Sequence, residues 1–322
     1  MNMDVSIIIP VYNVEPYVEA CLNSVISQSY IGSMECIIVD DCGTDGSMII
    51  AENILRLYKG PIKFRIIHHD TNYGLSAARN TGLKAAIGKY VYFLDSDDTI
   101  EIECIKLMME TARKYPEAEL VQGGSKMSTG LELMNLKSKK LLTYTENRKY
   151  IVKSLLNVNI MPVSSWNKLV KRSFLIDNSL YFIEGVIHED IGWCFYLSKY
   201  LKRLAICKYN TYNYLVREGS IMSGLKEEKA LNSCLKLSDD FINNISDEFK
   251  IQQLGYIFRL LQSHYVFAES KKNKQLVKNA LCHLRLKMSY IDKFVLSSFL
   301  VFPNFLLKKK FIYKAYTYYF VK

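Results

Sequence analysis

Apolar and polar positions alternate in a regular way along the first 120 residues of this 322-residue chain. Residues 5–11 form an apolar run, which is typical of a strand buried on both faces, and we expect further strands at residues 35–39, 64–67 and 90–94. Between and after these runs, apolar side chains recur at helical spacing, which predicts helices within residues 13–25, 45–57, 76–87 and 99–115. This alternation predicts an α/β fold, with a mainly parallel, Rossmann-like sheet flanked by helices.

The rest of the chain changes character twice. Residues 125–149 are rich in Lys, Ser and Gly and only weakly periodic, so we expect mobile loops there. From about residue 224 onward the pattern is almost wholly helical. We therefore expect one domain at residues 1–223, made of a part at 1–120 and a part at 121–223, followed by a helical region at residues 224–322.

The net charge of +10 is concentrated near the C-terminal end. Residues 271–322 hold twelve Lys or Arg and one acid, Asp292, a sum of +11 that leaves −1 for residues 1–270. Lysines interleaved with Tyr, Phe and Leu are typical of a segment that binds an anionic membrane surface, which is the interpretation we favour. The alternative is a helical domain with solvated lysines that packs on the first domain. Nucleic-acid binding is a third interpretation, which no recognised module supports.

Cysteine usage and the apolar segments indicate the cytoplasm. The eight cysteines form no C-x-x-C pair, so neither a zinc site nor a disulfide framework is predicted. The first residues lead straight into a strand pattern, without the basic start and apolar segment of a signal peptide. The longest apolar stretch, residues 294–307, is interrupted by Pro303 and falls short of the ~20 residues that cross a bilayer. We expect a cytoplasmic protein, bound peripherally to the inner face of the cytoplasmic membrane through the basic tail.

Acidic side chains follow three of the four predicted strands, and ligands of such sheets bind beyond the carboxyl ends of the strands. Asp95, Ser96, Asp97 and Asp98 come directly after the run 90–94. Two carboxylates one residue apart can face one Mg²⁺ or Mn²⁺ ion, together with phosphates of a ligand. An acidic turn that caps a helix is the alternative. We favour the metal site, because the preceding run is strongly apolar and neighbouring strand ends are acidic too.

Two further segments could contact a nucleotide. Asp40 and Asp41 end the second strand, where a carboxylate can accept hydrogen bonds from a ribose hydroxyl or a base N–H, or serve only a turn. Neither G-x-G-x-x-G nor G-x-x-x-x-G-K-[ST] follows the first strand, so metal and side chains would have to hold the nucleotide. In the loop and helix start at residues 72–80, Arg79 and Asn80 could point back at the ligand. The alternative for Arg79 is an exposed helix arginine.

A candidate general base lies farther along the chain. His188, Glu189 and Asp190 begin a predicted helix, where acidic side chains suit the helix dipole. Asp190 could instead take the proton from a substrate hydroxyl as its oxygen attacks. The residues by themselves leave these two interpretations even.

Taken in order, these blocks resemble glycosyltransferase family 2, of the GT-A type. The matching segments cover about the first third of the chain, at residues 5–13, 38–47, 72–80 and 95–98. Later segments resemble bacterial polysaccharide-assembly members of that family, at residues 166–169, 189–190 and 217–221. The resemblance makes residues 1–223 a catalytic domain, with a nucleotide-binding part at 1–120 and an acceptor part at 121–223.

The resemblance implies an inverting transfer of a sugar from a nucleotide-diphosphate donor, with UDP the commonest nucleotide. The acceptor would be a hydroxyl of a glycan or a lipid-linked molecule in cell-surface polysaccharide or capsule synthesis. The resemblance and the residues described above together predict the residues that contact the donor. These are Pro10, Tyr12, Glu15, Asp40, Asp41, Arg79, Asp95, Ser96 and Arg217. Asp97, with Asp95, would bind the Mn²⁺ or Mg²⁺ ion, and Asp190 would be the base. One base suffices for a single displacement, whereas retaining glycosidases need two carboxylates.

Two other functions would share parts of this site. A non-catalytic nucleotide-sugar-binding subunit would keep the donor residues and would need no base. A nucleotidyltransferase also uses strand-end carboxylates and metal, but no Gly-rich triphosphate loop with Arg or Lys follows the first strand. The presence of both a metal candidate and a base candidate favours the transferase.

Overall fold

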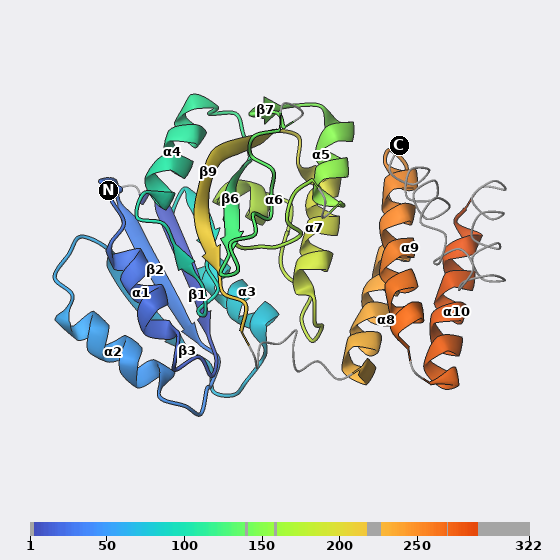
Figure 1. Ribbon diagram of the computed structural model, residues 1–322, viewed down its shortest axis with the longest axis horizontal. Coiled ribbons are helices and arrows are strands. Elements are labelled where there is room, and N and C mark those ends of the chain that lie inside the picture. Colours follow the sequence, from blue (N-terminus) through green and yellow to red (C-terminus); the bar gives the residue numbers. More distant parts are fainter. Residues whose placement is uncertain (1–2, 139–140, 158–159, 218–226, 269, 289–322) are drawn as a thin grey trace. The chain divides into compact units, whose positions relative to one another are not determined.

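The computed structural model describes residues 3–138, 141–157, 160–217, 227–268 and 270–288. The chain divides into two compact units (Figure 1). The first comprises residues 1–185 and 189–220, and the second comprises residues 186–188 and 221–322.

The first unit is built on one mixed sheet of nine described strands. The strands are β1 Val5–Val11, β2 Met34–Asp40, β3 Lys63–His68, β4 Tyr90–Phe93, β5 Thr99–Ile100, β6 Leu120–Met127, β7 Tyr144–Thr145, β8 Lys168–Lys171 and β9 Leu204–Tyr214. Their order is β3-β2-β1-β4-β8-β6-β9-β5, and β7 pairs with β9. Strands β1 to β4 run parallel, whereas β8 is antiparallel to β4 and β6. The expected mainly parallel sheet flanked by helices is confirmed, and its antiparallel pairings are those of β8 with β4 and β6 and of β5 and β7 with β9.

Helices cover both faces of this sheet (Figure 1). They are α1 Val18–Ile26, α2 Ser47–Leu57, α3 Leu75–Ala85, α4 Cys104–Lys114, α5 Arg148–Leu155, α6 Arg172–Asp177 and α7 Glu189–Tyr200. Side chains of β1 alternate between two buried clusters: Ile7 and Ile9 join the cluster that holds α1 and α4, and Ile8 joins the cluster that holds α3 and α7. Burial on both faces is the reason that β1 appears in the sequence as an unbroken apolar run.

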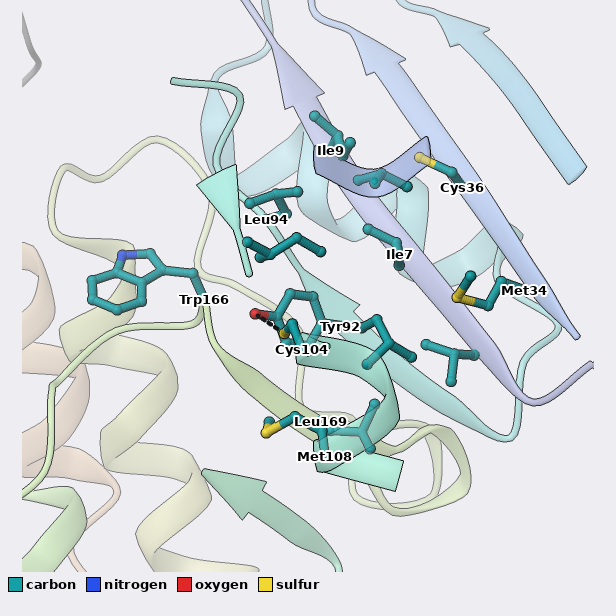
Figure 2. Close-up of a cluster of buried hydrophobic side chains, with 14 of the residues drawn as sticks. Ile7, Ile9, Met34, Cys36, Tyr92, Leu94, Cys104, Met108, Trp166 and Leu169 are labelled. Atoms are coloured by element: carbon teal, nitrogen blue, oxygen red, sulfur yellow. Dashed lines mark hydrogen bonds between the residues drawn. The ribbon is translucent and has the colours of Figure 1, made fainter. Parts of the chain in front are cut away.

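Figure 2 shows the first of these clusters, where Tyr92 of β4 lies among apolar side chains of β1, β2 and α4. The Tyr92 hydroxyl accepts a hydrogen bond from Cys104 Sγ at 3.4 Å and donates one to Asn167 Oδ1 at 3.0 Å. A buried hydroxyl is thus satisfied on both sides, as a close-packed interior requires. The contacts join α4 and the chain before β8 to the centre of the sheet.

The strand register brings the carboxyl ends of the parallel strands to one edge. Val11 pairs with Asp40, and Asp40 pairs with His68 across β1, β2 and β3. On the other side of β1, Ile8 pairs with Phe93, so the chain leaves β4 toward the same edge. The acidic side chains that follow β2 and β4 therefore lie at the same edge of the sheet, with the end of β1 between them.

Two predicted helix starts were wrong. Thr99–Ile100 form β5, which pairs with β9, and α4 begins only at Cys104. The helix expected from residue 13 begins at Val18. Asn13 instead has a positive φ of 51°, and its side-chain oxygen accepts the Thr44 N–H at 2.8 Å. In both places a contact with a distant part of the chain overrides the local pattern.

The second unit is helical where it is described, as expected. Its helices are α8 Glu227–Asn243, α9 Lys250–Phe267 and α10 Lys271–Leu286. Apolar side chains such as Leu237, Ile257 and Leu281 are buried in it. Residues 271–287 carry six Lys or Arg and no acid. Within the described residues no helix is both long and apolar enough to cross a membrane, and the basic residues of 289–322 lie outside them.

Candidate active site

Two carboxylates stand at the sheet edge directly after β4. Asp95 Oδ1 lies 2.6 Å from Arg79 Nη2, and Asp97 Oδ2 lies 2.8 Å from Arg217 Nε. Each of the two Asp side chains is 23 % exposed, so both remain reachable from solvent. Each arginine bonds one oxygen of its carboxylate, and a cation or a ligand can approach from the other side.

Arg79 lies deeper than the sequence suggested. Its side chain is 1 % exposed, and its Nη1 lies 2.5 Å from Glu189 Oε1 and 3.5 Å from Asp190 Oδ1. Burial opposes its charged form, but Asp95, Asp190 and Glu189 raise the pKa of Arg79 above its ordinary value, so it stays charged. The alternative of an exposed helix arginine is wrong, because the guanidinium is buried against three carboxylates. The contact of Arg79 with a nucleotide stays a prediction.

Asp190, the candidate base, begins α7 and is 19 % exposed. Its Oδ1 accepts the Ser165 N–H at 3.0 Å and faces Arg79. Burial raises the pKa of Asp190 to about 7, with Glu189 and Asp95 adding to the rise and Arg79 opposing it. A carboxylate with a pKa near neutrality suits a general base, because part of it is ionised near neutral pH and it binds a proton more tightly than an ordinary carboxylate does.

Arg217 follows β9 and packs against α1 as well as Asp97. Its guanidinium carbon lies 4.6 Å from the centroid of the Tyr17 ring, a cation–π distance. A pocket of about 260 Å³ opens beside Tyr17 and Asp97, and Asn213 and Tyr214 also line its wall. The chain therefore places one cation and two aromatic rings next to the carboxylate expected to bind metal.

Asp98 is an internal carboxylate. It is 2 % exposed, and it accepts hydrogen bonds from the Tyr212 hydroxyl at 2.6 Å and from the Leu215 N–H at 2.7 Å. Burial, with Asp95 and Asp97 nearby, raises the pKa of Asp98 to about 8. Asp98 thus anchors the end of β9, two residues before Arg217.

Asp40 and Asp41 take different positions after β2. The Asp40 carboxylate is 15 % exposed and accepts the backbone N–H of Cys42 at 3.1 Å, with His68 Nδ1 at 2.9 Å. Asp41 is 2 % exposed, and its oxygens accept the N–H groups of Tyr73 and Gly74. Asp40 can therefore still meet a nucleoside, whereas the structure assigns the Asp41 carboxylate to the turn before α3, where Gly74 has a positive φ of 89°.

The other expected donor contacts lie in or near the same edge. Tyr12 is 46 % exposed just after β1, while Pro10 is buried within that strand. Glu15 is exposed, and its Oε2 accepts the Gly46 N–H at 2.8 Å, which ties two loops together. Ser96, between the two metal candidates, is 6 % exposed.

The charge balance bears on whether a divalent ion fits here. The site gathers more carboxylates than cations, namely Asp95, Asp97, Glu189 and Asp190 against Arg79 and Arg217. Burial, and after it the charge of Asp95, raise the pKa of Asp97, whereas Arg217 lowers it. Within the described residues no group of three or more His, Cys, Asp or Glu side chains could hold a metal ion by itself. Two carboxylates with phosphate oxygens of a ligand are a donor set that suits Mg²⁺ or Mn²⁺.

Sequence reasoning missed two contributors to the site and assigned no partner to a third. Tyr17 stacks on Arg217, the Ser165 N–H holds Asp190, and Glu189 neutralises Arg79. The sequence named Glu189 only as an acid at the helix start. Tyr17 and Ser165 carry no local signal, because their partners are distant in the sequence and the Ser165 group is a backbone N–H.

The sheet, its flanking helices and this acidic edge define a glycosyltransferase of the GT-A type. The model of the family described as Glycosyl transferase family 2 matches residues 6–178, and the chain belongs to this family.

Curated relatives include EpsH of Bacillus subtilis (strain 168), 29 % identical over 253 residues, which are 77 % of this chain and 71 % of that protein. The poly(ribitol-phosphate) beta-N-acetylglucosaminyltransferase TarS of Staphylococcus aureus is 29 % identical over 226 residues, 69 % of this chain and 37 % of TarS. The glycosyltransferase GlyA of Streptococcus pneumoniae is 31 % identical over 227 residues, 67 % of this chain and 31 % of GlyA. The chain thus spans only about a third of the length of TarS and GlyA.

Solved structures agree on the fold. S. aureus TarS 1–349 in complex with UDP-GlcNAc superposes with a TM-score of 0.70 at 24 % identity, covering 89 % of this chain and 82 % of that chain. The mannosyltransferase PcManGT of Pyrobaculum calidifontis, in complex with GDP-Man and Mn²⁺, gives a TM-score of 0.56 at 14 % identity, with coverages of 100 % and 86 %. At these identities the likeness establishes the architecture, and the roles of individual residues rest on their own geometry.

Proposed function

We propose that this protein is an inverting, metal-dependent glycosyltransferase that moves a sugar from a nucleotide-diphosphate donor to a hydroxyl of a glycan or lipid-linked acceptor. The donor nucleotide is UDP, which is the nucleotide named for the TarS complexes. The product belongs to a cell-surface polysaccharide. The support is that the name of TarS states the transfer of a sugar to a polymer, poly(ribitol-phosphate).

One observation carries the proposal: a single buried guanidinium connects the donor-side carboxylate to the base. Arg79 lies 2.6 Å from Asp95 through Nη2 and 3.5 Å from Asp190 through Nη1. A displacement needs residues that bind the diphosphate and a base that accepts the hydroxyl proton. In this proposal they lie on either side of the Arg79 guanidinium. A sugar whose diphosphate is held at Asp95 and Asp97 would present its anomeric carbon toward Asp190.

In this proposal the acceptor hydroxyl approaches the Oδ2 atom of Asp190, since Oδ1 already accepts the Ser165 N–H. The hydroxyl oxygen forms a bond to the anomeric carbon while the bond from that carbon to the phosphate oxygen breaks. Asp190 takes the hydroxyl proton, and the nucleoside diphosphate leaves with the bonding electrons. Attack from the side opposite the leaving group inverts the anomeric centre in one step.

Asp97 and Asp95 are the residues that would hold Mn²⁺ or Mg²⁺. When bound, the ion neutralises the negative charge that develops on the departing diphosphate. Arg217 stands beside Asp97 and can stabilise the same charge. For the nucleoside we retain Tyr12 and Asp40 as contacts, because both keep exposed surface at the strand ends.

The remaining expected contacts are proposed with narrower roles. Pro10 and Ser96, both buried, would limit the depth of the site through their backbones. Glu15 would hold the loop that carries Tyr12, since it accepts the Gly46 N–H. Asp41 would shape the turn before α3.

We also propose that the protein acts in the cytoplasm at the inner face of the cytoplasmic membrane. The support is the concentration of six Lys or Arg without an acid in residues 271–287, continued by the basic sequence that follows. A lipid-linked acceptor would then lie at the same membrane face as the enzyme. Lysines near an anionic surface contribute about 1 kcal/mol each to such binding.

Asp190→Asn tests the catalytic assignment. The substitution keeps the size of the side chain and removes the base, so turnover should fall by about 100-fold to 10,000-fold. Binding of UDP with Mn²⁺, measured by calorimetry, should persist. Asp177→Asn, at the exposed end of α6, is the matched control and should change neither quantity.

The same pair of measurements separates the alternatives. A non-catalytic nucleotide-sugar-binding subunit would bind donor and show no turnover even as the wild-type chain. Full transfer activity in Asp190→Asn would overturn the assignment of the base.

A further inference from the structure

Lys168 of β8 is a lysine that has no contact with solvent. It is 0 % exposed, and its Nζ donates to the Pro162 carbonyl at 3.1 Å and to Ser164 Oγ at 3.3 Å. Among the ion pairs of the described residues none includes Lys168. Burial lowers the pKa of Lys168 below its ordinary value, and Cys194 and Asp190 oppose this effect. A buried ammonium that is not paired with a carboxylate is costly, so its presence calls for a reason beyond the filling of space.

The two hydrogen bonds of Lys168 hold residues 162–165, a segment before β8 that has neither helical nor strand structure. Side chains alternate along a strand, so Lys168 faces the same side of the sheet as Val170, which belongs to the buried cluster that holds α7. The Ser164 hydroxyl, besides accepting from Lys168, donates to the Trp166 carbonyl at 3.3 Å. The ammonium thus closes a loop of its own chain on the side of the sheet where α7 packs.

This segment also contacts the proposed base. The Ser165 N–H donates to Asp190 Oδ1 at 3.0 Å, and Ser165 is 0 % exposed. The backbone of Ser164 forms a hydrogen bond with Cys194, one turn farther along α7. Because Oδ1 is held, rotation of the carboxylate plane is restricted, and Oδ2 keeps one direction. The position of segment 162–165 therefore determines the orientation of the base.

The alternative is that Lys168 only supports the fold. Strand β8 contains a lysine for comparison, because Lys171 also donates to a proline carbonyl, that of Pro116, at 2.6 Å. Lys171 is partly exposed, and its hydrogen bond joins β8 to the chain before β6. Lys168 differs from it in two respects: it is fully buried, and the segment that it holds contacts Asp190.

We propose that Lys168 is a positioning residue for Asp190: it fixes segment 162–165, so that the Ser165 N–H holds Oδ1 and leaves Oδ2 for the acceptor hydroxyl. The inference deepens the proposed function and rests on it, because Asp190 is the base there. The positive charge of Lys168 also favours the ionised form of Asp190, which is the form that accepts the proton. Lys168 itself contacts neither donor nor acceptor.

The test uses Lys168→Met and Ser164→Ala in the full chain, with Lys171→Met as the matched control. Lys168→Met keeps the length of the side chain and removes the ammonium, whereas Ser164→Ala keeps the charge and removes one of its two acceptors. We expect kcat to fall about 100-fold in Lys168→Met, since a shift of about 1 Å in a catalytic group has an effect of that size, and to fall less in Ser164→Ala. The Kd for UDP with Mn²⁺ should stay within about threefold of the wild type in all three variants.

The pH dependence of kcat separates positioning from a general loss of structure. The groups that face Asp190 are Arg79 of α3, Glu189 of α7, Asp95 after β4, Lys168 of β8 and the Ser165 N–H, and Lys168 also faces Cys194. Loss of the Lys168 charge or of the Ser165 hydrogen bond disfavours the ionised carboxylate, so the pKa of Asp190 rises. The acidic limb of the kcat profile should therefore move to higher pH in Lys168→Met and Ser164→Ala, and should stay in place in Lys171→Met.

Amide hydrogen exchange measures the same contact without substrate. Exchange of the Ser165 N–H should accelerate in Lys168→Met and Ser164→Ala and should not change in Lys171→Met. Unchanged exchange or an unmoved acidic limb in these two variants would overturn the inference, and so would a rise in Kd for UDP that matches the fall in kcat. If Lys168→Met does not fold, Ser164→Ala decides by the same criteria. Failure of the proposed function would show differently, as a wild-type chain without turnover in which the Ser165 exchange still responds.

Discussion

Replacing Asp98 by Asn should make the protein more stable, and increasingly so as the pH rises. Asp98 is almost fully enclosed, at 2 % exposure, and lies between Tyr212 and the Leu215 N–H. Burial, with Asp95 and Asp97 adding repulsion, raises the pKa of Asp98 from 3.8 to about 8. Asn has the same size and shape and carries no charge, so it removes the penalty for ionising the buried group.

The magnitude follows from the difference in pKa between the folded and unfolded states. The folded state holds the Asp98 proton more tightly than the unfolded state, so its stability falls as pH rises from about 4 to about 8. At about 1.4 kcal/mol for each unit of pKa, the penalty is roughly 3 kcal/mol near pH 6 and roughly 5 kcal/mol near pH 8. The Tyr212 hydroxyl loses its acceptor in the variant, which costs about 1–3 kcal/mol at either pH. The stability gain of Asp98→Asn should therefore increase by about 2 kcal/mol between those pH values.

Urea unfolding with EDTA present measures this gain without a bound cation, which would lower the pKa of Asp98. Both tryptophans, Trp166 and Trp193, lie in the first unit, so their fluorescence reports the unit that holds Asp98. A gain that is constant or shrinks as the pH rises would refute the raised pKa. The variant should also bind UDP with Mn²⁺ as the wild type does, and loss of that binding would mean that Asp98 is a metal ligand.

The remaining predictions concern the metal and the membrane. Asp97→Asn should weaken Mn²⁺-dependent binding of UDP about 100-fold in calorimetry, because the site loses a charged ligand, and EDTA should have the same effect on the wild type. If neither Asp97→Asn nor EDTA changes the affinity for UDP, the proposed metal dependence is wrong. The full chain should bind vesicles containing phosphatidylserine in a flotation assay, and should be released as salt screens its lysines. Equal binding to neutral phosphatidylcholine vesicles, or none to either, would contradict the membrane assignment.

Much of the first unit could be predicted from local pattern. Strands β1, β2 and β4 appear in the sequence as apolar runs because both of their faces are buried, and the helices between them repeat apolar residues at helical spacing. Parallel order then brings the strand ends together, so that Asp40, Asp95 and Asp97 could be assigned to one edge before any coordinates. These predictions depend only on residues close to one another in the chain.

The partners of the site residues were decided by tertiary structure. Arg79 looked like a helix arginine near a ligand, but its carboxylate partners on α7 are 110 and 111 residues away. Asp41 is a predicted nucleotide contact, and only the fold shows that its oxygens accept the N–H groups of the turn before α3. Likewise, Thr99–Ile100 became a strand because β9 offers it a pairing edge.

The elements could be predicted and the partners of the site residues could not, because the first depend on local sequence and the second on contacts between distant residues. Side-chain periodicity records which face of an element is buried, and that information is present in every short stretch of sequence. Charge neutralisation and hydrogen bonding of a buried polar group depend on whatever the completed fold places beside it, and a single sequence does not record those neighbours. The sequence determined which chemical groups stand at the sheet edge, and only the fold decided that Arg79 serves the carboxylates there.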